Sequence, residues 1–158
     1  MKVPQQITVG TKEYVEIMTK INLYIATYGC NWVHNYINNI PLRFQKVKGR
    51  NAGGYIISKV CNEYKVTEFD LFNGSGRKEL TEARQVLCAL IARHLRYNQK
   101  QIASYFNKSR YFATRAIQSI NSRVSEKHPF DKEMIAHFTK LDGLVTSYMA
   151  FEPKTKKA

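Results

Sequence analysis

The stretch from Gln99 to Val124, QKQIASYFNKSRYFATRAIQSINSRV, decides the fold that the sequence predicts. A short segment with inward-pointing apolar residues, 99–106, is followed by the turn Asn107-Lys108-Ser109 and by a longer segment that begins at Arg110. In the longer segment apolar residues recur at steps of four, three and four, which is the period of a helix with one buried face. Either Asn107 or Ser109 can cap this helix. The stretch therefore predicts a helix-turn-helix.

The outward face of the second helix is rich in cations and hydrogen-bonding groups and contains no carboxylate. We expect the inward face to consist of Ala113, Ile117, Ile120 and Val124. The opposite face then carries Arg110, Tyr111, Thr114, Arg115 and Gln118, followed by Asn121 or Ser122. Arginine can form a bidentate pair with guanine, glutamine can pair with adenine, and threonine or tyrosine can reach a phosphate or a thymine methyl group. A solvated helix face usually mixes acidic with basic residues, so this face favours contact with double-stranded DNA.

Two adjacent aromatic residues, Tyr111 and Phe112, stand at the start of this helix. They can stack on bases or contact methyl groups in the groove. They can equally pack against residues 1–50 or against a partner protein. The sequence leaves both interpretations open.

Upstream and downstream of this unit the pattern remains helical, so the predicted fold class is all-α. From Tyr55 onward one apolar stripe comprises Ile56, Ile57, Val60, Cys61 and Tyr64. Thr67-x-x-Asp70 can cap a short helix through Leu71 and Phe72. Residues 82–97 form the longest apolar helix, which buries Val86, Leu87, Leu90, Ile91 and Leu95 and ends at Asn98. We expect a last helix near 132–148, anchored by Met134, Ile135, Phe138 and Leu141.

The first third of the chain predicts a separate helical segment. Residues 11–28 have helical apolar spacing, and a second short helix around Trp32 should end before Pro41. The stretch RFQKVKGRNAGG is rich in cations and glycine and predicts a linker or flexible loop. We therefore divide the chain into an N-terminal helical segment with a basic linker (1–54), a helix-turn-helix domain (55–150) and a flexible tail (151–158).

A glycine-flanked basic loop, Gly74-Ser75-Gly76-Arg77-Lys78, precedes the long helix. Such a loop can enter a minor groove or clamp a phosphate, although taken alone it is more often a surface turn. Further cations around the same unit carry the charge that phosphate contacts need. We expect the phosphate contacts to come from Arg77, Lys78, Arg84, Arg96 and Lys108.

Residues 56–124 carry a resemblance to a known family. In order they contain a V-x-x-x-D-L step (Val66 to Leu71), the basic loop, an Arg84-Gln85 pair, Asn98 and the helix-turn-helix. This order resembles the C-terminal DNA-binding domain of the bacterial replication initiator DnaA, without that protein's ATPase domain. The resemblance implies that Arg77 and Lys78 touch the minor groove and that residues 110–118 read the major groove.

The resemblance has one clear departure. The signature of the family at the recognition helix, Asp-His-Thr-Thr, falls on Ser109-Arg110-Tyr111-Phe112, and none of its four residues is present. The turn is also one residue shorter. We therefore expect DNA to be read differently from the initiator's own site.

Composition favours a polyanionic partner. The chain has 158 residues, 44% of them hydrophobic, which is enough to bury a core. There are 25 Lys and Arg residues against 12 Asp and Glu residues, and the net charge of +13 favours nucleic acid or an anionic membrane surface. The less favoured alternative is that the protein comes from an organism whose proteins are generally basic. Residues 128–158 carry five cations and four anions, so the binding surface should lie upstream.

Several function classes are excluded by missing patterns. The glycines of GRNAGG and GSGRK do not complete the GxxxxGK[ST] phosphate-binding loop, so the chain cannot be an ATP-driven initiator by itself. The four histidines lack Cys or carboxylate neighbours at ligand spacing, so we expect no metal. No nucleophile elbow, paired carboxylates or HExxH motif is present. We expect a protein that is not an enzyme and has no cofactor.

The sequence also predicts a cytoplasmic location. The N-terminus, MKVPQQITVG, lacks the apolar region of a signal peptide, and no apolar run approaches the ~18 residues of a membrane span. Cys30, Cys61 and Cys88 are odd in number and form no CxxC pair, which favours buried reduced thiols. We expect a bacterial cytoplasmic protein, or a virion protein if a phage encodes it, with no membrane partner.

Two functions from different classes remain. The first is a double-stranded DNA-binding protein of a bacterium, phage or mobile element that acts in replication, transcription control or DNA packaging. The second is a protein-interaction or structural component, such as a virion component, that keeps the fold but not base reading. In that case residues 1–50 would bind a protein partner or a second copy. Nonspecific RNA binding is a weaker third, because the aromatic motifs of common RNA modules are absent.

Overall fold

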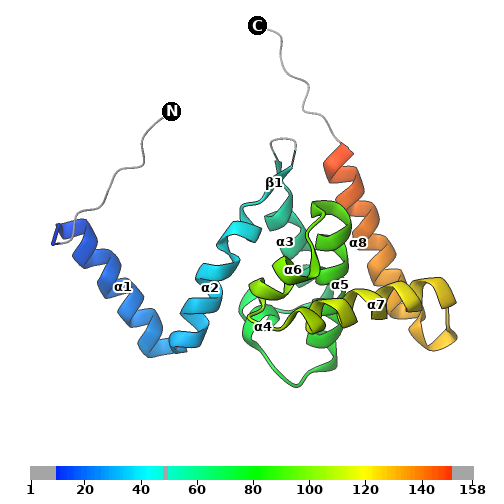
Figure 1. Ribbon diagram of the computed structural model, residues 1–158, viewed down its shortest axis with the longest axis horizontal. Coiled ribbons are helices and arrows are strands. Elements are labelled where there is room, and N and C mark those ends of the chain that lie inside the picture. The colour runs from blue at the N-terminus through cyan, green and yellow to red at the C-terminus, as the bar shows by residue number, and fades with distance from the viewer. Residues whose placement is uncertain (1–9, 48–49, 151–158) are drawn as a thin grey trace, which may run out of the picture.

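The computed structural model describes residues 10–47 and 50–150, and this part of the chain is predominantly helical (Figure 1). The elements are α1 (Lys12–Tyr28), α2 (Cys30–Arg43), β1 (Lys46–Val47), β2 (Arg50–Asn51), α3 (Ala52–Tyr64), α4 (Glu68–Asn73), α5 (Lys78–Leu90), a π-helix η1 (Ile91–Leu95), α6 (Gln99–Tyr105), α7 (Arg110–Glu126), a 3-10 helix η2 (Pro129–Asp131) and α8 (Lys132–Ala150). The strands β1 and β2 pair antiparallel. The predicted all-α class is confirmed.

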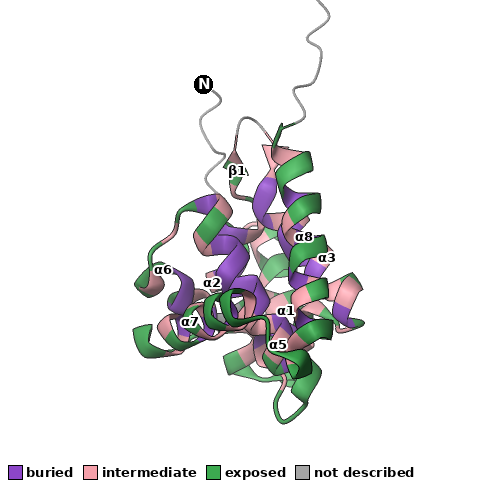
Figure 2. Ribbon diagram, turned by 90° about the vertical axis from the view of Figure 1, so that its right-hand side faces the viewer, coloured by how far each residue is buried: buried purple, intermediate pink, exposed green. Residues whose placement is uncertain are grey.

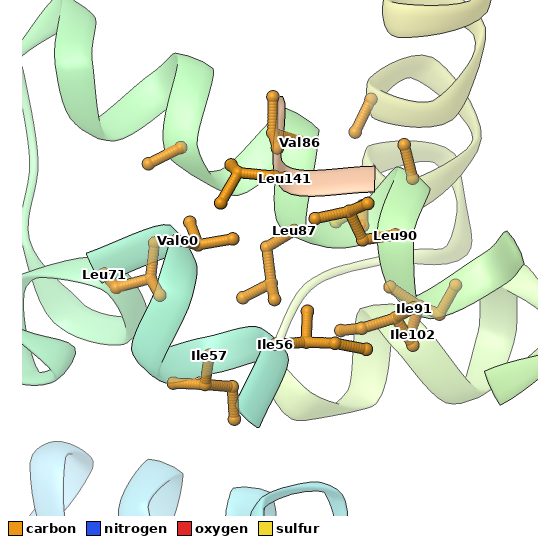
Figure 3. Packing of buried hydrophobic residues seen from close by; sticks show 14 of the residues in the cluster. Ile56, Ile57, Val60, Leu71, Val86, Leu87, Leu90, Ile91, Ile102 and Leu141 are labelled. Atoms are coloured by element: carbon orange, nitrogen blue, oxygen red, sulfur yellow. The ribbon is translucent and has the colours of Figure 1, made fainter. Parts of the chain in front are cut away.

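The hydrophobic core lies between α3, α5, α7 and α8, with α5 in contact with the other three. In Figure 3, Val60 of α3, Leu87 of α5 and Leu141 of α8 lie close together. The apolar residues predicted to be buried in the long helix are all buried. Its bounds differ, however. The helix begins at Lys78 because Leu80 already packs into the core, and its last turn widens into the π-helix η1.

The predicted helix, turn and helix are formed by α6, residues 106–109 and α7. Asn98 begins α6 with a capping box, in which its side chain accepts from the Gln101 N–H and Gln101 accepts from the Asn98 N–H. Asn107 closes the turn in the left-handed region at φ 50°. The buried face of α7 differs slightly from the prediction. Ala113, Ala116 and Ile120 are buried, whereas Ile117 and Val124 are only partly covered.

The N-terminal helices α1 and α2 form a V at one side of the body (Figure 1). Gly29 joins them with φ 87° and ψ 156°, a conformation that is essentially open only to glycine. No residue of α1 is buried, and buried positions concentrate in the other helices (Figure 2). The prediction that the second helix ends before Pro41 is wrong, because α2 continues to Arg43. Burial of Leu42 offsets the cost of a proline inside a helix.

The stretch RFQKVKGRNAGG is not a linker where the structure describes it. Asn51 caps α3 by accepting from the Gly54 N–H at 3.0 Å, so α3 begins at Ala52 and includes both glycines. Gly53 packs directly against the end of α2, where an added Cβ would lie 1.7 Å from the Leu42 carbonyl oxygen. Glycine therefore serves close helix packing here rather than flexibility. The sequence pattern could not distinguish the two uses.

Arg84 of α5 fastens the end of α4 to the core. Its Nε donates to the Leu71 carbonyl at 2.6 Å, and its terminal nitrogen donates to the Asp70 carbonyl at 2.9 Å and to the Gly74 carbonyl. Leu71 lies in the last turn of α4 and Gly74 is the C-cap residue, so their carbonyls are at the helix end where intrahelical N–H groups run out, whereas the Asp70 carbonyl also accepts from the Gly74 N–H at 2.7 Å. Partial burial lowers the pKa of the Arg84 guanidinium from its usual value.

Charged pairs attach α8 to the rest of the body. Asp142 accepts from Arg93 and from His94, both at 2.8 Å, and Glu63 of α3 binds His137 and Lys140. Hydrogen bonds from Lys140 and His137 hold the pKa of Glu63 below its usual value. None of the described helices is both long and apolar enough for a membrane crossing.

The cysteines do not share one environment. Cys88 is buried, Cys61 is partly covered and Cys30 is exposed, so burial of all three is not observed. Burial raises the pKa of Cys61 to about 11, which keeps that thiol protonated and unreactive near neutral pH.

Gly53→Ala should lower the free energy of unfolding by about 2 kcal/mol or more, because the new methyl group would collide with the Leu42 carbonyl. Gly143→Ala is the matched control, since Gly143 lies in α8 with nothing within 4 Å of an added Cβ. That control should stabilise the protein by about 0.5–1 kcal/mol. Urea unfolding measures both. Equal stability of the two variants would contradict the close contact between α2 and α3.

Arg84→Lys should lower the free energy of unfolding by about 2–3 kcal/mol, because an ammonium cannot replace the fork that reaches three carbonyls. Thermal and urea unfolding give the measurement. Lys78→Ala removes an exposed cation of the same helix and should change stability by less than about 0.5 kcal/mol. A fully stable Arg84→Lys protein would show that the guanidinium matters only as a charge.

Candidate nucleic-acid interface

The predicted recognition face of α7 lies on the solvent-exposed side of the helix. Arg110, Arg115 and Gln118 are exposed, and the Tyr111 side chain is 66% exposed. Thr114 is half-buried, and its hydroxyl donates to the Arg110 carbonyl at 3.1 Å. The single acidic residue of α7 is Glu126, at the C-terminal end. The N-terminal half of α7 thus presents cations and hydrogen-bonding groups together, as the sequence predicts.

Arg115 and Tyr111 form a pair on this face. The Arg115 guanidinium lies 5.4 Å from the centroid of the Tyr111 ring, which is cation–π distance. The ring limits the positions that the long arginine side chain samples while leaving its donors directed outward. A preordered guanidinium loses less conformational entropy when it binds a base edge or a phosphate.

The first turn of α7 is suited to an anion. Ser109 is its N-cap residue, but the Ser109 side chain makes no capping hydrogen bond, and the first turn contains no acid. The N-terminal N–H groups of a helix attract phosphate through their donors and through the helix dipole. Lys108 precedes this turn and is exposed. Within the described part of the chain its ammonium makes no ion pair.

A shallow cavity of about 340 Å³ separates the start of α7 from α5. The α7 side contributes Ser109, Tyr111, Phe112, Arg115 and Ala116, and the α5 side contributes Thr81, Arg84 and Gln85. Thr81 and Gln85 lie one helical turn apart and therefore share a face of α5. Our sequence reasoning did not assign either residue a binding role. The signal in the sequence that could have identified them is the four-residue spacing that places Thr81 on the same helix face as Gln85.

The basic loop lies next to α4. Arg77 is the N-cap of α5, and its guanidinium pairs with Asp70 at 3.1 Å. Lys78 is 84% exposed and lies 3.8 Å from Glu82. Both side chains remain largely solvent-exposed, and exposed ion pairs of this kind are weak. Both cations can therefore reach a phosphate.

Two of the predicted phosphate contacts, Arg84 and Arg96, have other surroundings. Arg84 directs its guanidinium to backbone carbonyls of the protein, so much of its donor capacity is already used. Arg96 ends η1 in the left-handed region, before α6 begins. The turn with Lys108 follows α6, so the whole of α6 lies between Arg96 and the start of α7 in the sequence. Arg77, Lys78 and Lys108 are exposed, and their cationic groups remain accessible for a phosphate.

The two adjacent aromatics point in different directions. Tyr111 faces solvent, whereas the Phe112 ring packs against Phe106 with 5.3 Å between their centroids. Phe112 also lines a cleft whose opposite wall contains Tyr28 and Trp32. Phe112 therefore packs against Phe106 and lines the cleft that it shares with Tyr28 and Trp32, whereas Tyr111 stays available on the α7 face.

Among the described residues, no group of three or more His, Cys, Asp and Glu side chains could hold a metal ion. The histidines instead serve packing and ion pairs with α8, as His94 and His137 show. The exposed cations and hydrogen-bonding groups of α7 and its surroundings are suited to binding a polyanion.

Comparison with known proteins supports this geometry. The model of the family described as the bacterial dnaA protein helix-turn-helix matches residues 54–120, which run from α3 into α7. No curated protein and no solved structure matches the chain significantly. The match covers the helices that carry the basic loop and most of the recognition face. Residues 54–120 therefore match a helix-turn-helix domain of the bacterial DnaA type, a kind of domain that binds double-stranded DNA.

Proposed function

We propose that the protein binds double-stranded DNA by placing the N-terminal half of α7 in the major groove. The observation that carries the proposal is the exposed, acid-free face of α7 within a helix-turn-helix domain of the DnaA type. In helix-turn-helix proteins the N-terminal residues of the second helix reach the base edges. Here these residues are Arg110, Tyr111, Thr114, Arg115 and Gln118.

Phosphate contacts flank this face on both sides in the proposed complex. Lys108 and the uncapped first turn of α7 hold one phosphate, and Arg77 and Lys78 approach the backbone or the minor groove from the loop before α5. Arg84 acts chiefly by holding α4 and the basic loop in position. Arg96 adds positive charge that contributes to electrostatic attraction rather than to register.

The proposed target sequence differs from that of the initiator. Arg110 and Arg115 can each form a bidentate pair with guanine, which is worth about 1–3 kcal/mol of discrimination. Gln118 can read adenine further along the groove. We propose that the protein acts in replication, transcription control or DNA packaging of a bacterium, phage or mobile element. Selection from random duplexes would identify the preferred bases.

A second candidate function is a protein-interaction or structural role. The observation that favours it is the apolar surface of the N-terminal V, where Val15, Leu23, Tyr24 and Ile37 are exposed. Such surfaces commonly mark protein contacts. The two functions are separable, because a protein complex formed through α1 and α2 should survive the loss of Arg110 and Arg115.

Affinity for a duplex should fall steeply with salt. With ~4–7 phosphate contacts, the logarithm of the association constant should fall against the logarithm of salt concentration with a slope of roughly −4 to −6. Fluorescence anisotropy of a labelled duplex over a salt series measures this. Absence of duplex binding at low salt would exclude the proposal.

The double variant Arg110→Ala plus Arg115→Ala should weaken duplex binding at least about tenfold, because it removes two groove-facing guanidinium groups. Lys20→Ala is the matched control, since Lys20 is an exposed cation on α1, away from the body. The control should change duplex affinity less than about threefold. Retained affinity in the double variant, with partner protein still captured, would favour the interaction role instead.

A further inference from the structure

A second surface of the molecule combines aromatic rings, amides and a cation in one cleft. The cleft has a volume of about 410 Å³ and lies between the corner of α1 and α2, the end of α4 and the turn before α7. Its size falls within the range of roughly 300–1,000 Å³ that is usual for small-ligand pockets. It is distinct from the outward face of α7, since Phe112 rather than Tyr111 lines it.

The rim of the cleft is an aromatic cluster of Tyr28, Trp32 and Phe69. The ring centroids of Tyr28 and Trp32 are 4.7 Å apart, and Phe69 lies 5.8 Å and 5.7 Å from them. Tyr28 is 50% exposed and Phe69 is 41% exposed, so both residues remain in contact with water. Gly29 fixes this corner, because its backbone conformation sets the direction in which α2 leaves α1.

Beside further apolar rings (Phe72, Phe106 and Phe112), the remaining lining is polar and carries positive charge. Asn31, Asn73, Asn107 and Lys108 line the cleft together with the aromatic rim, and no carboxylate does so. Amides can pair with the edges of bases, and a lysine can hold a phosphate as a point charge. The acids nearest in sequence to Phe69 are already paired, Glu68 with Arg43 and Asp70 with Arg77.

This composition fits an unpaired nucleobase better than a protein segment. Exposed aromatic rings beside a cationic path are the features by which proteins hold single-stranded nucleic acid, because every base offers a face for stacking. A docked protein helix needs an aliphatic groove. Aliphatic residues line the neighbouring surface with Ile21, Val33 and Ile37, which shares Tyr28, Trp32 and Phe69 with the cleft, whereas the amides and Lys108 belong to the cleft alone. The cleft is also adjacent to Lys108, which precedes the recognition helix.

We propose that the cleft binds an unpaired base of a single nucleic-acid strand, stacked against Tyr28 and Trp32 with its phosphate beside Lys108. The protein then holds two forms of nucleic acid on adjoining surfaces, a duplex at α7 and a single strand at the α1–α2 corner. Such a molecule is suited to a junction between paired and unpaired strands. This site does not depend on base reading by Arg110 or Arg115.

Trp32 is the only tryptophan of the chain, so its fluorescence reports directly on the cleft. Titration with single-stranded oligo-dT at low salt should quench this fluorescence in a saturable manner, because a stacked base deactivates the indole. Deoxythymidine monophosphate alone should bind much more weakly, since it lacks neighbouring phosphates. Equally tight binding of the monophosphate, or no quenching by oligo-dT, would overturn the proposal.

Variants separate this site from duplex binding. Tyr28→Leu and Trp32→Leu should each weaken binding of labelled oligo-dT roughly ten- to a hundredfold, as loss of a stacking ring does, with duplex affinity unchanged. Phe130→Leu is the matched control, because the Phe130 side chain is 92% exposed outside the cleft and should have no effect.

Trp32→Phe keeps an aromatic ring and should restore most of the binding, which distinguishes stacking from a folding defect. Unchanged oligo-dT affinity in both leucine variants would overturn the proposal. Sedimentation of the wild-type protein completes the test. A dimer that dissociates when Trp32 is replaced, with no oligo-dT binding, would also overturn it, because the aromatic corner would then be a protein interface. If the wild-type protein binds oligo-dT but not a duplex, that result would instead contradict the proposed function.

Discussion

The placement of α7 depends on its close packing against α5. Ala113, Ala116 and Ile120 are the buried residues of α7, and the small alanine side chains allow neighbouring helices to approach closely. Helix α5 in turn is held by α3 and α8 through a continuous apolar core. Because the inward face of α7 is fixed in this way, its outward face has a defined direction. The exposure of Arg110 and Arg115 on the outward face follows from that geometry.

A second constraint organises the basic loop. The guanidinium of Arg84 satisfies the carbonyls at the end of α4 and so determines where the chain leaves that helix. The loop with Arg77 and Lys78 begins there and ends as α5 starts. One arginine thus supports other cations that remain exposed. The same type of residue serves structure in one case and the proposed contact with DNA in the other, and burial separates the two roles.

The N-terminal V adds an aromatic cleft beside the helix-turn-helix. Gly29 turns the chain so that Tyr28 and Trp32 approach Phe69 of α4, and Phe112 of α7 lines the same cleft. The family match begins at residue 54 and does not include this corner. The aromatic cleft is therefore a property of the whole chain rather than of the matched domain.

The sequence by itself determined the all-α class, the helix-turn-helix and the outward face of α7, because helical periodicity and capping residues such as Asn98 are local signals. Tertiary structure alone decided three other points: the continuation of α2 through Pro41, the use of Gly53 for close packing, and the engagement of Arg84 with backbone carbonyls. It also brought Trp32 beside Phe69, across more than thirty residues of sequence. The physical reason is common to all of them. Burial and contacts between distant segments outweigh local preferences, and no window of sequence contains those partners.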